Sequence, residues 1–159
     1  MILDKEKVTS NLANKGVVEY LNENKYKKNL EFIYDISLVK NKNKEFKTHP
    51  DILRLLWNDY YRKLPMQCQM ILFGTPVLIN PINGIIFGIA EGTNPPLLRL
   101  SQNQIPIIIN KGGKITLSDM DGVYADASVL GDEWVYCFSF IKNIDEYCLQ
   151  AYDHSGSFR

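Results

Sequence analysis

The chain contains the stretch Gly74-Thr75-Pro76-Val77-Leu78-Ile79-Asn80-Pro81-Ile82-Asn83-Gly84-Ile85-Ile86-Phe87-Gly88-Ile89-Ala90, in which two apolar runs flank an Asn-Gly pair. Asn-Gly is the strongest short-range signal for a β-hairpin, because the tight turn needs residues that accept a positive φ. We therefore expect residues 76–80 and 85–90 to be strands that pair antiparallel. A third apolar run, residues 70–73, precedes them and is expected to be a strand as well.

Short apolar runs continue toward the C-terminus. Residues 97–100, 107–110 and 114–117 are expected to be strands, the last two joined by Lys111-Gly112-Gly113. Residues 134–140 fit either a strand or a buried helix, because periodicity does not distinguish the two in so short a run. Residues 143–154 repeat apolar side chains at helical spacing, which predicts a closing helix.

The N-terminal part of the chain alternates helical and strand-like periods. Residues 6–24 repeat apolar side chains at a period near 3.6, which predicts one amphipathic helix that buries Val8, Leu12, Val17 and Leu21. Residues 30–39 change to a period of two, which predicts a half-buried strand. Thr48-His49-Pro50-Asp51 predicts a helix start with Thr48 as the cap, and this helix is expected to run to about residue 63. Its buried stripe would comprise Ile52, Leu55, Leu56, Tyr60 and Leu64.

The order of these elements is helix, strand, helix, several short strands and a final helix. It lacks the regular strand–helix alternation of a doubly wound fold, so we expect an α+β fold with a mainly antiparallel sheet, two N-terminal helices and a C-terminal helix. The length of 159 residues suits one domain, and no linker or repeat divides the chain. We therefore expect residues 1–159 to form a single globular domain.

Charge is balanced overall and uneven locally. Eighteen basic and eighteen acidic side chains cancel, so no overall field attracts nucleic acid or an anionic membrane. Residues 1–65 carry thirteen Lys and Arg against nine Asp and Glu, whereas residues 66–159 carry five against nine. Much of the positive excess lies in two clusters interleaved with Asn, residues 25–28 and 40–47, which are typical of solvated turns. We expect no direct binding of nucleic acid.

The cysteines and the apolar runs indicate the compartment. Cys68, Cys137 and Cys148 form no C-x-x-C pair, so no zinc site is predicted and reduced, buried thiols are expected. No apolar run approaches the roughly 20 residues of a membrane span. The first six residues become charged at once and lack the apolar segment of a signal peptide. These features predict a cytoplasmic protein.

The sharpest motif is Asp119-Met120-Asp121-Gly122-Val123, which resembles the first motif of haloacid-dehalogenase-like phosphatases. In that family the first aspartate is the nucleophile and the second a general acid or base, beside magnesium. The position departs from the family, because the motif normally opens the fold and further motifs must follow it. A calcium loop that starts at Asp119 fails too, since its twelfth position is Leu130 where a glutamate is needed. His49 and His154 are explained by helix ends.

Acidic and aromatic residues concentrate around this motif. Asp119, Asp121, Asp126, Asp132 and Glu133 place five acids within fifteen residues, without Lys or Arg among them. Tyr124 and Trp134 stand among or beside them. One interpretation is two solvated acidic turns around a core Trp. The other is a partner-binding patch, in which acids steer a basic partner, aromatic side chains anchor it, and Arg99 pairs with one carboxylate.

Several segments resemble small bacterial immunity proteins of polymorphic-toxin and contact-dependent growth inhibition systems. The likeness lies in Phe73-Gly74-Thr75-Pro76-Val77-Leu78, in Gly84-Ile85-Ile86-Phe87-Gly88-Ile89-Ala90-Glu91-Gly92-Thr93, in Leu97-Leu98-Arg99-Leu100, in Leu130-Gly131-Asp132-Glu133-Trp134-Val135, and in Cys148-Leu149-Gln150-Ala151-Tyr152-Asp153. The resemblance implies a non-enzymatic protein that binds and neutralises one toxin domain, often a nuclease, without metal or cofactor. The expected contact residues are Asp119, Asp121, Tyr124, Asp126, Asp132, Glu133 and Trp134.

Two alternatives stay open at this point. One is a small metal-dependent phosphoester hydrolase that uses Asp119 and Asp121. The other is a general adaptor subunit that associates with copies of itself.

Overall fold

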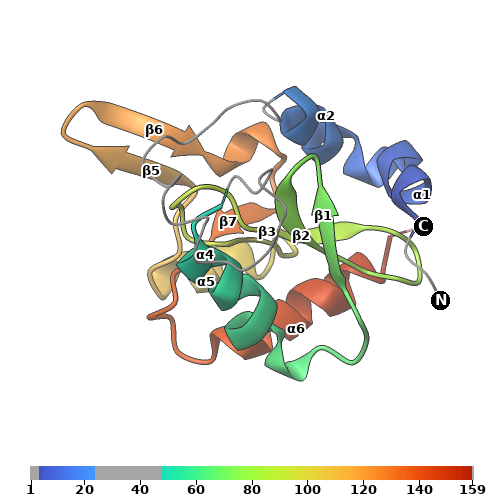
Figure 1. Cartoon of the computed structure of the whole chain (residues 1–159). Helices are drawn as coiled ribbons and strands as arrows, with labels where there is room; N and C mark the ends of the chain where they lie inside the picture. The colour runs from blue at the N-terminus through green and yellow to red at the C-terminus, as the bar shows by residue number, and fades with distance from the viewer. Residues whose placement is uncertain (1–3, 24–47, 159) are drawn as a thin grey trace.

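A computed structural model describes residues 4–23 and 48–158 and combines helices with antiparallel sheets (Figure 1). It confirms the expected α+β class. The elements, in order, are α1 (Lys5–Ser10), η1 (Leu12–Asn14), α2 (Lys15–Glu23), α4 (Pro50–Arg54), η3 (Leu55–Asp59), η4 (Tyr60–Lys63), β1 (Gln69–Leu72), β2 (Thr75–Ile79), β3 (Ile86–Ile89), β4 (Leu97–Arg99), α5 (Ile105–Asn110), β5 (Thr116–Asp119), β6 (Gly122–Asp126), η5 (Ala127–Val129), β7 (Trp134–Tyr136) and α6 (Ile144–Ser155).

The main sheet has five strands in the order β1-β2-β3-β4-β7, and every neighbouring pair is antiparallel. The predicted hairpin is confirmed, with Leu78 opposite Gly88 in the β2–β3 pair. Gly84 has a φ of +77°, the conformation for which the Asn-Gly signal selects. The run that begins at residue 134, which fitted a strand or a helix, forms the edge strand β7 and pairs with β4.

Both faces of this sheet are covered. On one face, Leu98 and Val135 pack with residues of η3, η4, α5 and α6. On the other face, Leu97 and Trp134 pack with residues of α1, α2 and β5. Side chains of neighbouring strand residues point to opposite faces, so β2 and β3 bury every residue. This explains why they read as continuous apolar runs rather than as alternating ones.

The expected single helix over residues 6–24 is wrong, because the chain breaks at Asn11. Asn11 is extended, with φ −72° and ψ 125°, and its side chain accepts a hydrogen bond from the Ala13 backbone N–H. An Asn side chain that bonds its own backbone in this way competes with the helix ladder. The break rotates Leu12 outward, where it is 85% exposed, while Val8, Val17 and Leu21 are buried as expected.

The helix start at Pro50 is confirmed, with a different cap. His49 is the capping residue, since its Nδ1 accepts a hydrogen bond from the Asp51 backbone N–H at 3.0 Å. Thr48 instead forms a parallel bridge with Gly92. The helix continues as a wide turn in η3 and a tight turn in η4 to residue 63. The strand expected at residues 30–39 lies outside the described residues.

The strand expected at residues 107–110 is wrong, because this run lies in α5. Pro106 occupies the first turn of the helix, where its missing N–H costs nothing. The Gly113 backbone N–H then bonds the Ile108 carbonyl at 2.9 Å and ends the helix. Ile105 and Ile108 are buried, whereas Ile107 and Ile109 are exposed. The closing helix is confirmed as α6.

The three cysteines are free and buried, as expected. Burial raises the pKa of the Cys68 thiol to about 12, and burial also raises the pKa of Cys137 and Cys148. They therefore behave as small apolar side chains. Across residues 4–23 and 48–158, no helix combines the length and the apolar character that crossing a membrane requires.

Candidate partner-binding surface

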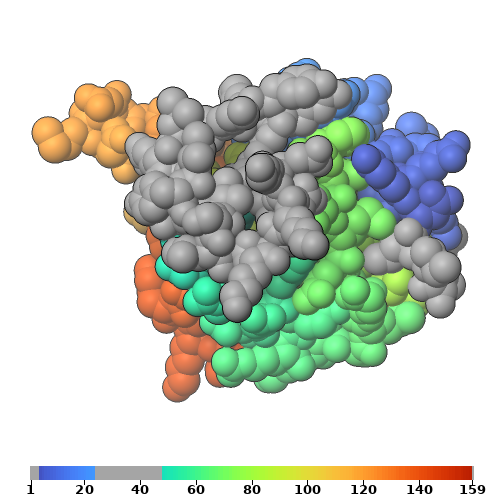
Figure 2. All heavy atoms as spheres, viewed as in Figure 1, coloured from blue at the N-terminus to red at the C-terminus, as the bar shows by residue number. Residues whose placement is uncertain are grey.

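The β5–β6 hairpin projects from the body of the molecule as a separate two-stranded sheet (Figure 1). Figure 2 shows its tip, in orange, standing clear of the neighbouring atoms. Leu117 fixes its base, because this side chain is only 4% exposed and packs in the core beside Trp134. The Ala127 backbone N–H also bonds the Ile115 carbonyl at 2.8 Å. The hairpin is thus anchored at its base and solvated at its tip.

Asp119 and Asp121 lie together at this tip. Asp119 ends β5 and pairs with Gly122, so the turn consists of Met120 and Asp121. The Asp119 Oδ1 accepts a hydrogen bond from the Asp121 backbone N–H at 2.8 Å. Gly122 has a φ of +112°, which favours glycine at this point of the turn. The Asp-x-Asp-Gly motif is therefore the turn of a hairpin, with both carboxylates in water.

Tyr124 and Asp126 lie on the same hairpin, farther from the tip. The Tyr124 side chain is 58% exposed. Asp126 ends β6 and caps η5, since its Oδ1 accepts hydrogen bonds from the Ser128 hydroxyl at 2.6 Å and the Ser128 N–H at 2.9 Å. These hydrogen bonds hold the pKa of Asp126 below its usual value. Asp126 is therefore a fixed negative charge at neutral pH.

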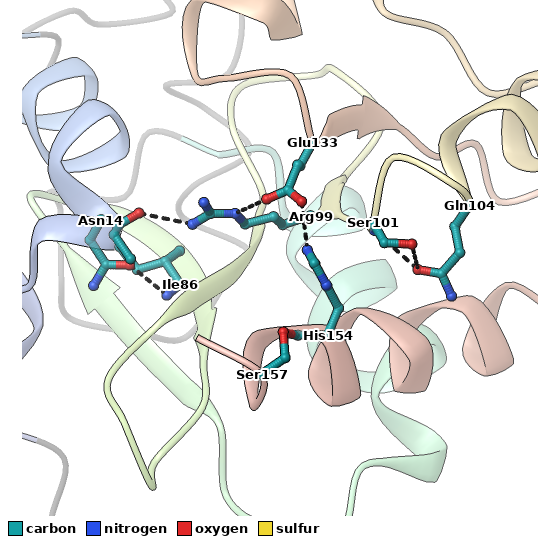
Figure 3. A network of polar contacts seen from close by, with 9 residues as sticks. Asn14, Ile86, Arg99, Ser101, Gln104, Glu133, His154 and Ser157 are labelled. Atoms are coloured by element: carbon teal, nitrogen blue, oxygen red, sulfur yellow. Dashed lines mark hydrogen bonds and ion pairs between the residues drawn. The ribbon is translucent and has the colours of Figure 1, made fainter. Parts of the chain in front are cut away.

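Asp132 and Glu133 form a second acidic group, in the loop before β7. Asp132 is exposed. Glu133 is engaged inside the fold, where its Oε1 accepts from Arg99 Nε at 3.3 Å and its Oε2 lies 2.8 Å from His154 Nε2 (Figure 3). The expected pairing of Arg99 with a carboxylate is confirmed. Arg99, Glu133 and His154 are 13%, 23% and 17% exposed, so the network is largely shielded from water.

Arg99 extends this network to both ends of the described chain. Its Nη1 donates to the Ala13 carbonyl at 2.9 Å, and its guanidinium lies 4.3 Å from the ring centre of Phe158. The Phe158 ring also meets the His154 ring edge-on at 5.1 Å. A charged group that is removed from water needs such partners to remain ionised. Arg99, Glu133 and His154 therefore hold the N-terminal segment, β4 and α6 together.

Trp134 lies in the core. Its side chain is 1% exposed and packs against the β5–β6 base and the N-terminal helices. Its Nε1 has no hydrogen-bond partner among the residues that the structure describes. The seven residues expected to form one contact surface thus divide into Asp119, Asp121, Tyr124 and Asp126 on the hairpin, Asp132 on the following loop, and Glu133 and Trp134 inside the fold.

Two exposed apolar residues on the hairpin were missed by the sequence analysis. Met120 at the tip is fully exposed and Val123 is 63% exposed. The signal was available, because an apolar residue inside an Asp-x-Asp-Gly turn has no core to reach. The pairing of His154 with Glu133 was also missed, since His154 was explained by the end of a helix. Arg99 within the apolar run Leu97-Leu98-Arg99-Leu100 was the corresponding signal that a buried ionic network exists.

A metal site would need several ligating side chains close together. Over residues 4–23 and 48–158, no group of three or more His, Cys, Asp or Glu side chains is arranged to hold a metal ion. In comparisons with known proteins, no family model, no curated protein and no solved structure matches this chain. The functional interpretation therefore rests on the fold and on the β5–β6 hairpin.

Proposed function

We propose that this chain is a non-enzymatic immunity protein, which binds a toxin domain in the cytoplasm and blocks its activity. The β5–β6 hairpin is the proposed contact. The resemblance of several segments to immunity proteins of polymorphic-toxin systems supports the class. The hairpin is favoured as the contact because it projects from the body of the described chain (Figure 1).

The observation that carries the proposal is the segregation of charge on this projection. Asp119, Asp121 and Asp126 lie on the hairpin, and no Lys or Arg occurs between Lys114 and Lys142. An acidic surface of this kind attracts a positively charged partner and raises the association rate. Toxins that act on nucleic acid carry basic clefts for phosphate groups, so they are the partners that this charge favours.

The experiment is co-purification with the neighbouring genes of the native locus. The tagged chain is expressed with these genes and captured, and any stoichiometric partner is identified by mass spectrometry. We expect one partner, which arrests growth when expressed alone and is harmless when expressed with this chain. The absence of a partner in both low and high salt would contradict the proposal.

A hydrolase would give a different result with the same purified protein. An enzyme that uses Asp119 as nucleophile would release phosphate from a phosphoester with magnesium, and Asp119→Asn would abolish that activity. We expect no such turnover that depends on Asp119. Phosphate release that Asp119→Asn removes would favour the enzyme over the immunity protein.

A further inference from the structure

A β-bulge lies in the projecting hairpin, on the β6 side. Leu117 pairs with Ala125 and Ser118 pairs with Val123, so Tyr124 is an extra residue without an opposite residue on β5. A bulge shifts the alternation of a strand by one residue and re-aims the side chains around it. Ala125 can therefore turn toward the core beside Leu117, while Val123 and Tyr124, directly before it, are both exposed.

Three large apolar side chains are thus exposed within five residues. Met120 is fully exposed, Val123 is 63% exposed and Tyr124 is 58% exposed. Single exposed apolar side chains are common on soluble proteins, whereas a group on one projecting element marks an interaction surface. Within residues 4–23 and 48–158, none of the three belongs to the apolar clusters of the core. Strand propensity suits Val123 and Tyr124 to β6, whereas it gives no reason for Met120 in the turn.

The apolar group lies among charges of one sign. Asp119 and Asp121 flank Met120 in the turn, and Asp126 follows Tyr124 by two residues. An apolar centre with a charged border is the usual arrangement of a protein interface, where the centre supplies binding energy and the border sets the association rate. All charged side chains of residues 115–141 are acidic, so we expect the complementary surface to be basic.

We infer that Met120, Val123 and Tyr124 form the anchor of the partner interface, and that the partner presents an apolar pocket bordered by Lys and Arg side chains. This inference rests on the proposed function and names the recognition chemistry of the same hairpin. Tyr124 supplies the largest contact, because an aromatic ring buries much area and loses little conformational freedom. The acids steer the partner onto it.

A second copy of this chain that pairs hairpin to hairpin is the other possible occupant, and charge opposes this arrangement. Two hairpins that met tip to tip would bring Asp119 and Asp121 of each copy together. No basic side chain lies between residues 115 and 141 to offset the repulsion. A basic foreign protein meets no such penalty.

The test uses the toxin domain that co-purifies with the chain and measures its binding by surface plasmon resonance. We expect Tyr124→Ala to weaken binding and to raise Kd about thirtyfold, mainly through faster dissociation. Tyr124→Phe keeps the ring and should stay within about threefold of the unmodified chain. Ile82→Ala is the matched control, because Ile82 is a 61% exposed apolar residue at the β2–β3 turn. Thermal unfolding of each variant checks that the fold is intact.

The outcomes separate this inference from the proposed function. A toxin that binds Tyr124→Ala as tightly as the unmodified chain would overturn the anchor and leave the immunity function in place. If no toxin co-purifies, the proposed function fails and the anchor fails with it. Sedimentation that shows a dimer, which Tyr124→Ala dissociates, would overturn the foreign partner in favour of a second copy.

Discussion

Asn14 joins the N-terminal segment to the central hairpin of the sheet. Its side chain is fully buried, and its Nδ2 donates to the Val8 carbonyl at 2.9 Å and the Gly84 carbonyl at 2.7 Å. Its Oδ1 accepts from the Ile86 backbone N–H at 2.8 Å. Buried backbone groups must be paired, and this one amide bonds one group of α1 and two groups where the β2–β3 connection enters β3.

We predict that Asn14→Ala lowers the free energy of unfolding by about 3 kcal/mol, because the Gly84 carbonyl and the Ile86 N–H lose their Asn14 hydrogen bonds inside the fold, while the Val8 carbonyl keeps only the Asn11 N–H. Urea unfolding followed by circular dichroism measures the change. Asn22→Ala is the matched control, since Asn22 is exposed on α2 and should leave stability nearly unchanged. Equal effects of the two substitutions would show that the Asn14 hydrogen bonds contribute little.

Because of the buried thiols, the free energy of unfolding decreases as pH becomes alkaline. Burial raises the pKa of Cys68 from 9.0 to about 12 and also raises the pKa of Cys137 and Cys148. The unfolded chain therefore loses these protons at a lower pH than the folded chain. This contribution to stability is complete below pH 9 and is lost as pH rises toward 12. Urea midpoints at about pH 8 and about pH 10.5 should show the decrease, and equal midpoints would contradict it.

The sequence predicts the helices and strands that are specified by residues close together along the chain. The β2–β3 hairpin follows from Asn83-Gly84 and α6 from its helical period, and both are present. The run at residues 107–110 has no period because it is almost wholly apolar, and Pro106 together with the Gly112-Gly113 turn makes it a helix. The period over residues 6–24 is real, yet one hydrogen bond at Asn11 interrupts it. Such side-chain competition leaves no trace in a hydrophobic pattern.

β3 packs tightly against β2 at Gly88. A Cβ atom at Gly88 would lie 2.9 Å from Leu78 Cδ1 and 3.0 Å from Leu78 Cβ. We predict that Gly88→Ala lowers the free energy of unfolding by about 2 kcal/mol, because the two strands have to move apart. Gly16→Ala is the control, since Gly16 is helical and exposed, and a Cβ atom there would lie 3.4 Å from the Leu130 carbonyl oxygen, an ordinary contact. This variant should be neutral or raise stability by up to about 1 kcal/mol. Two stable variants would mean that the sheet adapts at Gly88.

In the whole molecule, the sequence predicts correctly which candidate residues lie together on the hairpin. It does not predict where Glu133 and Trp134 lie. Asp119, Asp121, Tyr124 and Asp126 belong to one hairpin, so closeness in sequence brings them together. Glu133 instead pairs with Arg99 and His154, which lie 34 and 21 residues away. Trp134 is buried because β7 joins the edge of the sheet beside β4. Neither fact can be derived from spacing along the chain, since both depend on tertiary contacts.

We propose that the acidic hairpin binds and blocks a basic toxin domain. Asp119→Asn with Asp121→Asn tests it most directly, because an Asn oxygen at position 119 keeps the turn hydrogen bond while both charges disappear. The control is Glu19→Gln with Asp153→Asn, which removes two exposed charges from α2 and α6.

The measurement is the Kd for the co-purified toxin at low and at physiological salt. We predict that the hairpin variant binds about tenfold more weakly at low salt, mainly through slower association, and loses most of the salt dependence. The control should bind like the unmodified chain. Equal affinity and equal salt dependence of the hairpin variant and the unmodified chain would contradict the proposed role of the hairpin.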